Sequence, residues 1–323
     1  MRKPGWLKTR LPSGQEFEQL GRRLQKYGLN TVCSAARCPN LAECWERGTA
    51  TFMILGSTCT RNCRFCSVPT GNPRGVLDRE EPERVALAVA ELGLRYVVLT
   101  SVDRDDLADL GAGAFARTLY AIRNKPYAGA DPGLSSASLD AEEADEIGGG
   151  PVQSGVKREA SSVEPPRVEV LTPDFGARKE LIRQVVEAGP DVFGHNIETV
   201  QRLSDGVRDP RASFRRSLSV LETAKRLAPQ MKTKSGLMVG LGETDDEIVD
   251  TLRNLRSVGC NIVTIGQYLQ PDRRCLPVQR YVAPEQFARY ESRALEMGFT
   301  HAFCGPLVRS SYRAAEVFSS CAS

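Results

Sequence analysis

The residues of this chain best suited to metal chemistry are three cysteines that follow its first buried apolar run. Cys59, Cys63 and Cys66 have the spacing C-x3-C-x2-C. Three thiolates on one tight loop can bind three irons of a [4Fe-4S] cluster, which leaves the fourth iron open to a small molecule. A structural zinc site would need a fourth Cys or His close by, whereas the only histidines are His195 and His301. The pattern therefore favours an iron–sulfur cluster with an open iron over a zinc site.

A second cysteine triplet lies upstream with the spacing C-x4-C-x5-C, at Cys33, Cys38 and Cys44. By itself it is compatible with zinc ligands or with coincidence, but beside the first triplet it suggests a second cluster that also lacks one ligand. Disulfides fit such short spacings poorly. Cluster thiolates must stay reduced, which predicts a reducing compartment. The remaining cysteines have no metal-binding spacing and are expected to be structural: Cys260, Cys275, Cys304 and Cys321.

The composition is that of an ordinary globular protein. The 323 residues include 41% hydrophobic and 26% charged residues, and the net charge is +3. Such a weak positive charge gives no reason to expect nucleic-acid binding. No apolar run is long enough to span a bilayer, and the basic residues 1–9 lack the apolar core of a secretory signal. We therefore expect one large α/β domain with appendages.

Short apolar runs alternate with helical patterns from about residue 51 onward. One helical pattern begins at Pro82, with Val85 and Val89 on its apolar face, and another begins with a capping-box pattern at Thr244 and Glu247. Strand–helix alternation predicts a parallel sheet. The number of repeats, with no G-x-G-x-x-G after an early strand, favours a barrel or partial barrel over an open Rossmann sheet. The predicted strands are 51–56, 95–101, 168–172, 191–197, 233–240, 261–269 and 301–305.

Residues 126–166 break this alternation. The segment is rich in Gly, Ser, Ala, Pro and acidic residues and poor in large apolar ones. It cannot bury enough apolar surface to offset the entropy lost on ordering it. We therefore predict a disordered, low-complexity insertion on the barrel surface, and the alternative is a loop that binds a partner.

The C-x3-C-x2-C loop, with an aromatic residue before its last cysteine, resembles the radical S-adenosylmethionine (SAM) superfamily. Together with the upstream triplet and a terminal Arg-Ser-Ser-Tyr, it resembles the lipoyl synthase family in particular. The resemblance covers nearly the whole chain except the insertion. Further matching segments are 99–107 (LTSVDRDDL), 168–175 (VEVLTPDF), 234–244 (KSGLMVGLGET), 264–271 (TIGQYLQP) and 305–312 (GPLVRSSY). The sequence departs from the family pattern at 110–112, Gly194 and Cys275.

The resemblance implies a fold, the partial (β/α)6-type TIM barrel of the radical SAM superfamily with N-terminal and C-terminal extensions. The implied parts are an N-terminal extension with the upstream cysteines (1–50), the partial barrel (51–304) and a C-terminal segment with a cluster ligand (305–323). It also implies that the cluster of Cys59, Cys63 and Cys66 binds the amine and carboxylate of SAM at its open iron. One electron from that cluster would then split the sulfonium and give a 5′-deoxyadenosyl radical.

The resemblance further implies a second [4Fe-4S] cluster that is consumed as the sulfur donor. Its ligands would be Cys33, Cys38, Cys44 and Ser311. The implied reaction is a radical sulfur transfer that inserts two sulfur atoms at carbons 6 and 8 of a protein-bound octanoyl group. The implied partners are an octanoylated lipoyl carrier domain or protein, an electron donor such as ferredoxin or flavodoxin, and an iron–sulfur cluster carrier. The implied compartment is a bacterial cytoplasm or a plastid-type organelle, with a mitochondrion less favoured.

Polar residues at the ends of predicted strands are the candidates for contacts with SAM. Ser101, Asn196 and Glu198 lie at such ends, where barrel enzymes keep their sites. Arg208 is assigned to the SAM carboxylate, because a guanidinium suits that geometry. His195 is as compatible with a role in the core as with a functional one.

A glycine-rich segment, residues 236–243, fits the adenine-contacting pattern G-x-I-x-G-x-x-E of the superfamily. Gly240 and Glu243 are the candidate contacts within it. Glycines at a strand end let a flat ligand approach the backbone closely. The alternative is a plain tight turn from strand to helix.

Two other functions are less favoured by the sequence. Biotin synthase also inserts sulfur by radical chemistry, but its pattern is not found, and the paired triplets with Arg-Ser-Ser-Tyr argue against it. A ferredoxin-like electron carrier would need neither a barrel nor an open iron. The sequence therefore favours an enzyme over an electron-transfer protein.

Overall fold

A computed structural model describes most of the chain, and the residues it describes are 3–7, 26–31, 40, 49–125, 165–311 and 314–316. The predicted ligands Cys33, Cys38 and Cys44 lie outside the described residues. So does nearly all of the predicted insertion, of which only Pro165 and Pro166 are described.

The described part of the chain forms one eight-stranded sheet whose strand order follows the sequence. The short strand β1 (Asn30–Thr31) pairs antiparallel with β2, and the other strands run parallel. Each of the predicted strands is found, with ends shifted by a few residues. The parallel strands are β2 (Thr49–Ile54), β3 (Tyr96–Ser101), β4 (Arg167–Leu171), β5 (Val192–Gly194), β6 (Lys232–Val239), β7 (Ile262–Gln267) and β8 (His301–Gly305).

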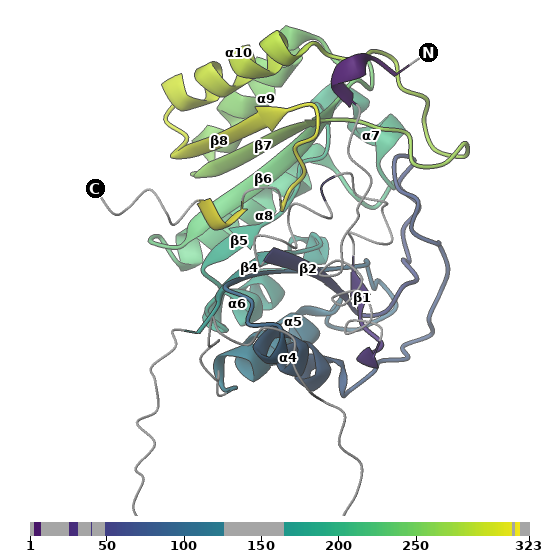
Figure 1. The fold of residues 1–323 in the computed structure, drawn as a ribbon, viewed down its shortest axis with the longest axis vertical. Helices are drawn as coiled ribbons and strands as arrows, with labels where there is room; N and C mark the ends of the chain where they lie inside the picture. The colour runs from purple at the N-terminus through teal and green to yellow at the C-terminus, as the bar shows by residue number, and fades with distance from the viewer. Residues whose placement is uncertain are drawn as a thin grey trace, which may run out of the picture.

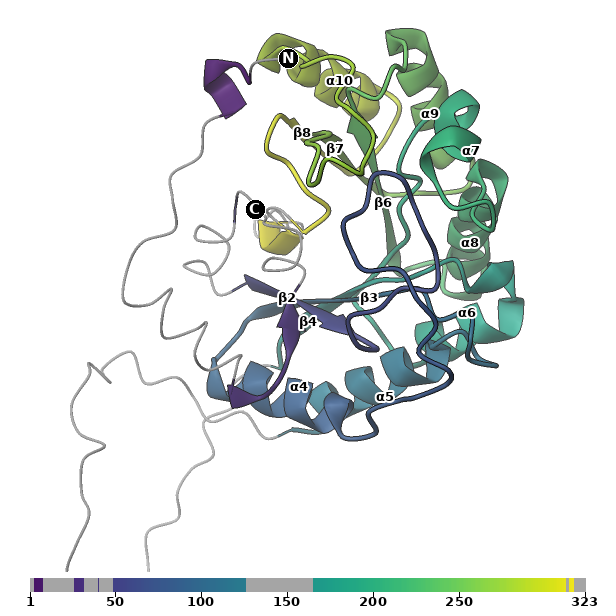
Figure 2. The same ribbon diagram turned by 90° about the vertical axis from the view of Figure 1, so that its right-hand side faces the viewer.

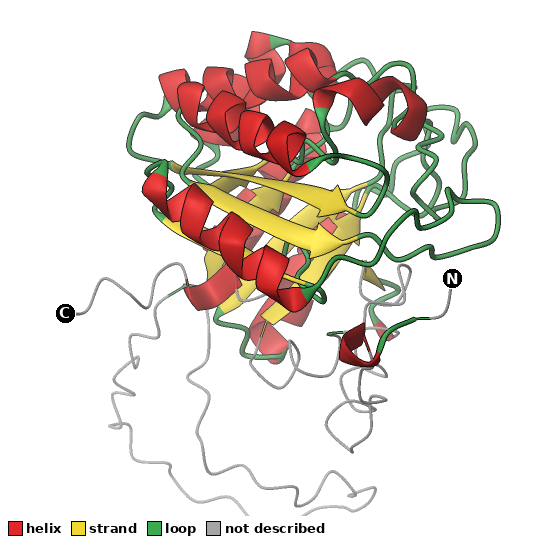
Figure 3. Cartoon of the chain, turned by 90° about the horizontal axis from the view of Figure 1, so that it is seen from above, coloured by secondary structure: helices red, strands yellow, loops and turns green. Residues whose placement is uncertain are grey.

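Helices connect successive strands and cover the outer face of the curved sheet (Figure 1, Figure 2). Seen from above, they form a layer around the strands (Figure 3). The α-helices are α4 (Glu81–Glu91), α5 (Ala112–Arg123), α6 (Lys179–Glu187), α7 (Ser204–Val207), α8 (Phe214–Leu227), α9 (Asp245–Ser257) and α10 (Pro284–Glu296). The 3-10 turns are η1 (Gly5–Leu7), η2 (Phe175–Ala177) and η3 (Gln201–Leu203). None of the helices in the described ranges is long and apolar enough to cross a membrane.

Among the described residues the sheet does not close, because β8 pairs only with β7 and β2 pairs only with β1 and β3. This confirms the predicted partial barrel. The two helix starts seen in the sequence are confirmed as well. Pro82 lies in the first turn of α4, and Thr244 forms a capping box with Glu247 at the start of α9.

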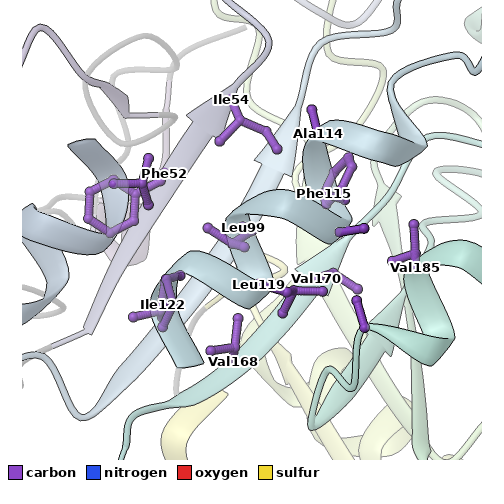
Figure 4. Packing of buried hydrophobic residues seen from close by; sticks show 14 of the residues in the cluster. Phe52, Ile54, Leu99, Ala114, Phe115, Leu119, Ile122, Val168, Val170 and Val185 are labelled. Carbon is purple, nitrogen blue, oxygen red and sulfur yellow. The ribbon is translucent and has the colours of Figure 1, made fainter. Parts of the chain in front are cut away.

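Apolar side chains pack the strands against the helices. Val168 and Val170 of β4 pack in one cluster with Phe115 and Leu119 of α5 (Figure 4). All four side chains are fully buried. Because side chains alternate along a strand, the intervening positions face the inside of the barrel. Both faces of the parallel strands are therefore buried, as is usual for parallel sheets.

The inside of the barrel contains a cluster of buried polar side chains. Lys234 of β6 donates to both carboxylate oxygens of Glu169 on β4, each at 2.9 Å. The Tyr96 hydroxyl of β3 donates to the same carboxylate at 2.9 Å. These contacts tie three strands together across the barrel interior.

The segment that follows β8 turns back along the inner side of the sheet (Figure 2). The Val308 carbonyl lies so close to β7 that a Cβ added at Gly266 would come within 2.2 Å of its oxygen. Farther on, Ala314 is fully buried against Tyr96 and Val98 of β3. The end of the described chain therefore crosses the concave face from β7 to β3.

Candidate functional site

The cysteine loop 59–66 follows β2 and lies at the carboxyl ends of the parallel strands. Several of the loops after neighbouring strands hold it through backbone contacts. The Thr60 amide donates to the Asp103 carbonyl at 3.0 Å, after β3, and the Arg64 amide donates to the Val207 carbonyl at 2.9 Å, after β5. The carboxyl ends of the strands are where barrel enzymes place their active sites. The position of the predicted cluster loop therefore agrees with the fold.

Arg61, inside the cysteine loop, is the buried cation at the centre of the site. It donates to both carboxylate oxygens of Asp174, each at 2.8 Å, and to Asp105 at 2.9 Å. Its Nη1 also lies 3.3 Å from the Asp103 carboxylate. Burial would raise the pKa of Asp174, but the hydrogen bonds and charge of Arg61 outweigh it and lower the pKa to about 2. Arg61 therefore fixes the cysteine loop to the loops after β3 and β4.

Sequence reasoning missed this role of Arg61. The available signal was a basic residue inside the cysteine triplet together with acidic residues in two matching segments, 99–107 and 168–175. Nothing local to either segment shows that they meet.

The loop after β5 contacts the middle of the cysteine loop. The Asp209 carboxylate accepts from the Asn62 amide at 2.8 Å, and the Asp209 amide points at the Cys63 sulfur at 3.4 Å. Arg211 pairs with the same carboxylate at 2.9 Å. An amide directed at a sulfur favours a thiolate there, since it donates to negative charge.

The surroundings of the three thiols raise the pKa of each. Burial first, and then the Asp103 carboxylate, raise the pKa of Cys59 to about 11. Burial also raises the pKa of Cys63, to about 12, and that of Cys66. Since a cluster binds thiolates, loading this loop must release protons.

The donor set fits a [4Fe-4S] cluster, which takes its cysteine sulfurs on separate irons. Within the described ranges, no three His, Cys, Asp or Glu side chains gather as ligands of a single metal ion. The assignment of Cys59, Cys63 and Cys66 therefore stays a prediction. Cys275 lies beside them, with its sulfur donating to the Cys66 carbonyl at 3.4 Å.

The predicted SAM contacts lie near the cysteine loop. The Ser101 hydroxyl, at the end of β3, is buried without a hydrogen-bond partner among the described residues. Such an orphaned group is expected where a polar ligand binds. Glu198 has a positive φ of 68°, and burial raises the pKa of its carboxyl, opposed by the charge of Arg208. Ser101 and Glu198 thus fit a polar ligand, and their roles stay predictions.

His195 takes part in a buried chain of hydrogen bonds that reaches Arg208. Its Nδ1 faces the Thr172 carbonyl at 2.9 Å and its Nε2 faces the Ser217 hydroxyl at 2.9 Å. Arg208 donates to the same hydroxyl at 2.8 Å. Burial and then the charge of Arg208 lower the pKa of His195 to about 4. This geometry favours the core role for His195, in which the neutral ring holds Ser217 and so orients Arg208.

We expect His195 to make the apoprotein less stable in mild acid. The unfolded chain binds a proton as the pH falls below about 6.5, whereas the folded protein resists protonation down to about pH 4. The contribution of His195 to the free energy of unfolding is therefore fully present above pH 6.5 and is lost as the pH falls. Between pH 7 and pH 5 this difference amounts to about 2 kcal/mol. Denaturant titrations at both pH values should show a smaller loss for His195→Gln, and equal losses in both proteins would contradict the assignment.

The glycine-rich segment after β6 forms a tight loop around a carboxylate. Glu243 is buried and accepts from the Gly240 amide at 2.6 Å and from the Leu241 amide at 2.9 Å. Gly240 has a φ of 105°, and a Cβ there would lie 2.2 Å from the Gln267 side chain. These contacts agree with the tight-turn alternative. The contact of Gly240 and Glu243 with adenine stays a prediction.

The two serines of the terminal motif differ in their partners. The Ser310 hydroxyl accepts from the Asn196 side chain at 2.9 Å. The Ser311 hydroxyl has no hydrogen-bond partner in the part of the chain that is described, and Ser311 is half-buried. The contact with Ser310 also shows that the Asn196 amide, a predicted SAM contact, faces the C-terminal segment.

One contact links the C-terminal segment to the upstream cysteine region. Asn40, two residues after Cys38, is buried and donates from Nδ2 to the Leu307 carbonyl at 2.5 Å. The two residues are 267 positions apart in the sequence. The structure thus brings a residue of the upstream triplet region beside the segment that ends in Ser311.

Comparisons with known proteins identify the superfamily of this chain. A family model described as the Radical SAM superfamily matches residues 53–255, and one described as the N-terminal domain of lipoyl synthase of the Radical SAM family matches residues 1–38. A crystal structure of Streptococcus suis SuiB bound to precursor peptide SuiA has a TM-score of 0.52 at 9% identity, covering 89% of this chain and 52% of SuiB. That likeness concerns the fold alone. Fold, cysteine loop and family model define a radical SAM enzyme.

Relatives with curated names show which family of this superfamily the chain belongs to. A lipoyl synthase of Thermus thermophilus is 48% identical over 98% of this chain and 86% of that protein. A lipoyl synthase of Halorhodospira halophila is 49% identical over 98% of this chain and 84% of that protein. The chain belongs to the lipoyl synthase family.

Proposed function

We propose that this chain makes the lipoyl group by inserting two sulfur atoms at carbons 6 and 8 of a carrier-bound octanoyl chain, using two clusters. Cys59, Cys63 and Cys66 would hold the cluster that binds SAM. Cys33, Cys38, Cys44 and Ser311 would hold the second, sacrificial cluster. When bound, the first supplies the electron that cleaves SAM and the second supplies the sulfur atoms. The family membership supports the reaction, and the contact between Asn40 and Leu307 carries the proposal for the second ligand set.

The protein's own residues bind, orient and shield the reactants. Arg208 is 7% exposed and is held by Ser217, so its guanidinium is oriented before the SAM carboxylate arrives. The buried Ser101 hydroxyl and the half-buried Glu198 carboxyl supply polar groups for the remainder of the ligand. The C-terminal segment packs over Gly266 of β7 and against Tyr96 and Val98 of β3, on the inner side of the sheet.

The two proposed clusters also assign different roles to different parts of the chain. We propose that residues 1–50 and 305–323 together bind the second cluster, while residues 51–304 form the barrel that binds the first cluster and SAM. The N-terminal and C-terminal parts would then make one site although they lie at opposite ends of the sequence.

The partners we propose follow from the reaction. The substrate is an octanoylated lipoyl carrier domain or protein. A one-electron donor such as ferredoxin or flavodoxin would reduce the first cluster, and an iron–sulfur cluster carrier would rebuild the second. The thiolate ligands require a reducing compartment, for which we propose a bacterial cytoplasm or a plastid-type organelle.

Iron analysis tests the number of clusters. After anaerobic reconstitution we expect about eight irons and about eight sulfides per chain, since each [4Fe-4S] cluster contributes four. A variant with Cys33, Cys38 and Cys44 replaced by alanine should bind about four of each. If the parent chain itself binds only about four irons, the second cluster does not exist.

Turnover tests the reaction class. Incubation of the reconstituted enzyme with SAM, dithionite and an octanoylated carrier domain should yield 5′-deoxyadenosine and the lipoylated carrier. Mass spectrometry would measure both products. An electron-transfer protein would be reduced by dithionite without cleaving SAM, and that result would refute the proposal.

A further inference from the structure

Each of the three cysteine sulfurs of the loop 59–66 faces one backbone amide. For the first and third cysteines, the donor lies two residues further along the chain. The Arg61 amide lies 3.4 Å from the Cys59 sulfur, and the Val68 amide lies 3.5 Å from the Cys66 sulfur. These two donors are therefore supplied by the local conformation of the cysteine loop and the residues just after it.

The donor for Cys63 comes from a distant part of the chain. The Asp209 amide, after β5, lies 3.4 Å from the Cys63 sulfur, and the two residues are 146 positions apart. The Asp209 carboxylate is buried and accepts from the Asn62 amide at 2.8 Å and from Arg211 Nε at 2.9 Å. Arg211 also donates to the Thr60 carbonyl at 2.6 Å. The side chain of Asp209 is thus bound to the cysteine loop, and it holds its own backbone amide at the middle sulfur.

Amides directed at the sulfurs of an iron–sulfur cluster affect how readily the cluster accepts an electron. The reduction potential of such a cluster depends in part on the hydrogen bonds to its sulfurs. Reduction adds negative charge, and an N–H donor binds a more negative acceptor more strongly. Each of the three amides therefore favours the reduced state, but only the amide at Cys63 depends on a contact between two loops.

We infer that Asp209 is a positioning residue for the first cluster: its carboxylate holds its backbone amide at the Cys63 sulfur and so raises the reduction potential of the cluster bound there. This inference rests on the proposed function, in which Cys59, Cys63 and Cys66 bind that cluster. It goes further, because the loop after β5 then sets how readily the SAM-cleaving cluster is reduced, although it supplies none of the cysteine ligands.

The test uses the full-length chain in which Cys33, Cys38 and Cys44 are replaced by alanine. Anaerobic reconstitution of this background protein should place about four irons on the loop 59–66. Iron and sulfide analysis gives the cluster content. A potentiometric titration, followed by the electron paramagnetic resonance signal of the reduced cluster, then gives its reduction potential without any turnover.

The decisive comparison is between Asp209→Ala and Asp209→Asn in this background. Both substitutions remove the negative charge, but asparagine keeps one side-chain oxygen that can accept from the cysteine loop or from Arg211. A difference between the two therefore reports on position and not on charge. Asp205→Ala is the matched control, because Asp205 is an exposed aspartate of α7, four residues earlier in the chain.

Loss of one hydrogen bond corresponds to about a three- to tenfold change in an equilibrium. At one applied potential, we expect the ratio of reduced to oxidised cluster to be about three- to tenfold lower in Asp209→Ala than in Asp209→Asn. A tenfold fall is a potential about 59 mV more negative. Asp205→Ala should match the background protein. A pure charge effect would instead raise the potential equally in both Asp209 variants, since the lost carboxylate opposed reduction.

Equal potentials of Asp209→Ala and Asp209→Asn at full iron content would overturn the inference and leave the proposed function intact. A background protein that binds no iron would overturn the proposed ligands of the first cluster, and the inference with them. If only Asp209→Ala fails to bind iron, Arg211→Met is compared with Arg64→Met. Each removes one positive charge next to the cysteine loop, and of the two arginines it is Arg211 that contacts Asp209, whereas Arg64 donates to the Gly206 carbonyl. A three- to tenfold lower ratio in Arg211→Met would support the inference, and equal potentials would overturn it.

Discussion

Replacing Ser311 with alanine should reduce formation of the lipoyl product at least about 100-fold while cleavage of SAM persists. Removing even an outer partner of a metal site typically costs about 10–100-fold, and Ser311 is proposed as a direct ligand. The first cluster has a separate set of ligands on the loop 59–66, so production of 5′-deoxyadenosine should stay within a few-fold of the parent. Mass spectrometry of the carrier and chromatography of the nucleoside measure the two quantities.

Two further variants sharpen this result. Ser257→Ala, at the exposed end of α9, should behave as the parent. Ser311→Cys should keep the cluster but slow its breakdown, because a thiolate is lost less readily than an alkoxide. Lipoyl formation at the parental rate by Ser311→Ala would refute the ligand assignment, and Ser310, now seen paired with Asn196, would be the next serine to test.

Replacing Arg61 with methionine should destabilise the apoprotein by about 3–5 kcal/mol, because breaking a buried ion pair leaves an uncompensated charge. The Arg61 side chain is 5% exposed and that of Asp174 is 1% exposed. The burial of Asp103 already raises the pKa of its carboxyl to about 6, with Arg61 opposing that rise. Without the guanidinium the carboxylates would repel one another, and the cysteine loop would lose its anchor. Denaturant unfolding of the apoprotein and iron content after reconstitution should both show the loss.

The control for this prediction is an arginine in an exposed pair. Arg253→Met removes the partner of Asp250, and both side chains are 64% exposed, so its effect should stay below about 1 kcal/mol. Adding Asp174→Asn to Arg61→Met should restore part of the stability, because it removes one of the unpaired charges. An Arg61→Met protein that unfolds within about 1 kcal/mol of the parent would show that the acidic residues do not depend on this cation.

The local elements and the kind of chemistry could be predicted from the amino-acid sequence. Short continuous apolar runs between helical patterns predicted each parallel strand, because such strands are buried on both faces and the run is visible within a few residues. The capping box at Thr244 is equally local and was found where expected. The spacing of Cys59, Cys63 and Cys66 indicated the cluster, since its ligands are neighbours in the sequence. Resemblance to the lipoyl synthase family then indicated the reaction.

Which distant residues meet depends on how the whole chain folds. Arg61 contacts Asp174, 113 positions away, and Asn40 contacts Leu307, 267 positions away; no local pattern encodes either pairing. The structure also distinguished the Ser310 hydroxyl, which accepts from Asn196, from the Ser311 hydroxyl, which has no hydrogen-bond partner among the described residues. The physical reason is that strand order and barrel curvature bring the loops after successive strands to one end, and the chain after β8 then returns across the open face. Adjacent residues of that returning segment meet different surroundings, which depend on the packing of the whole barrel.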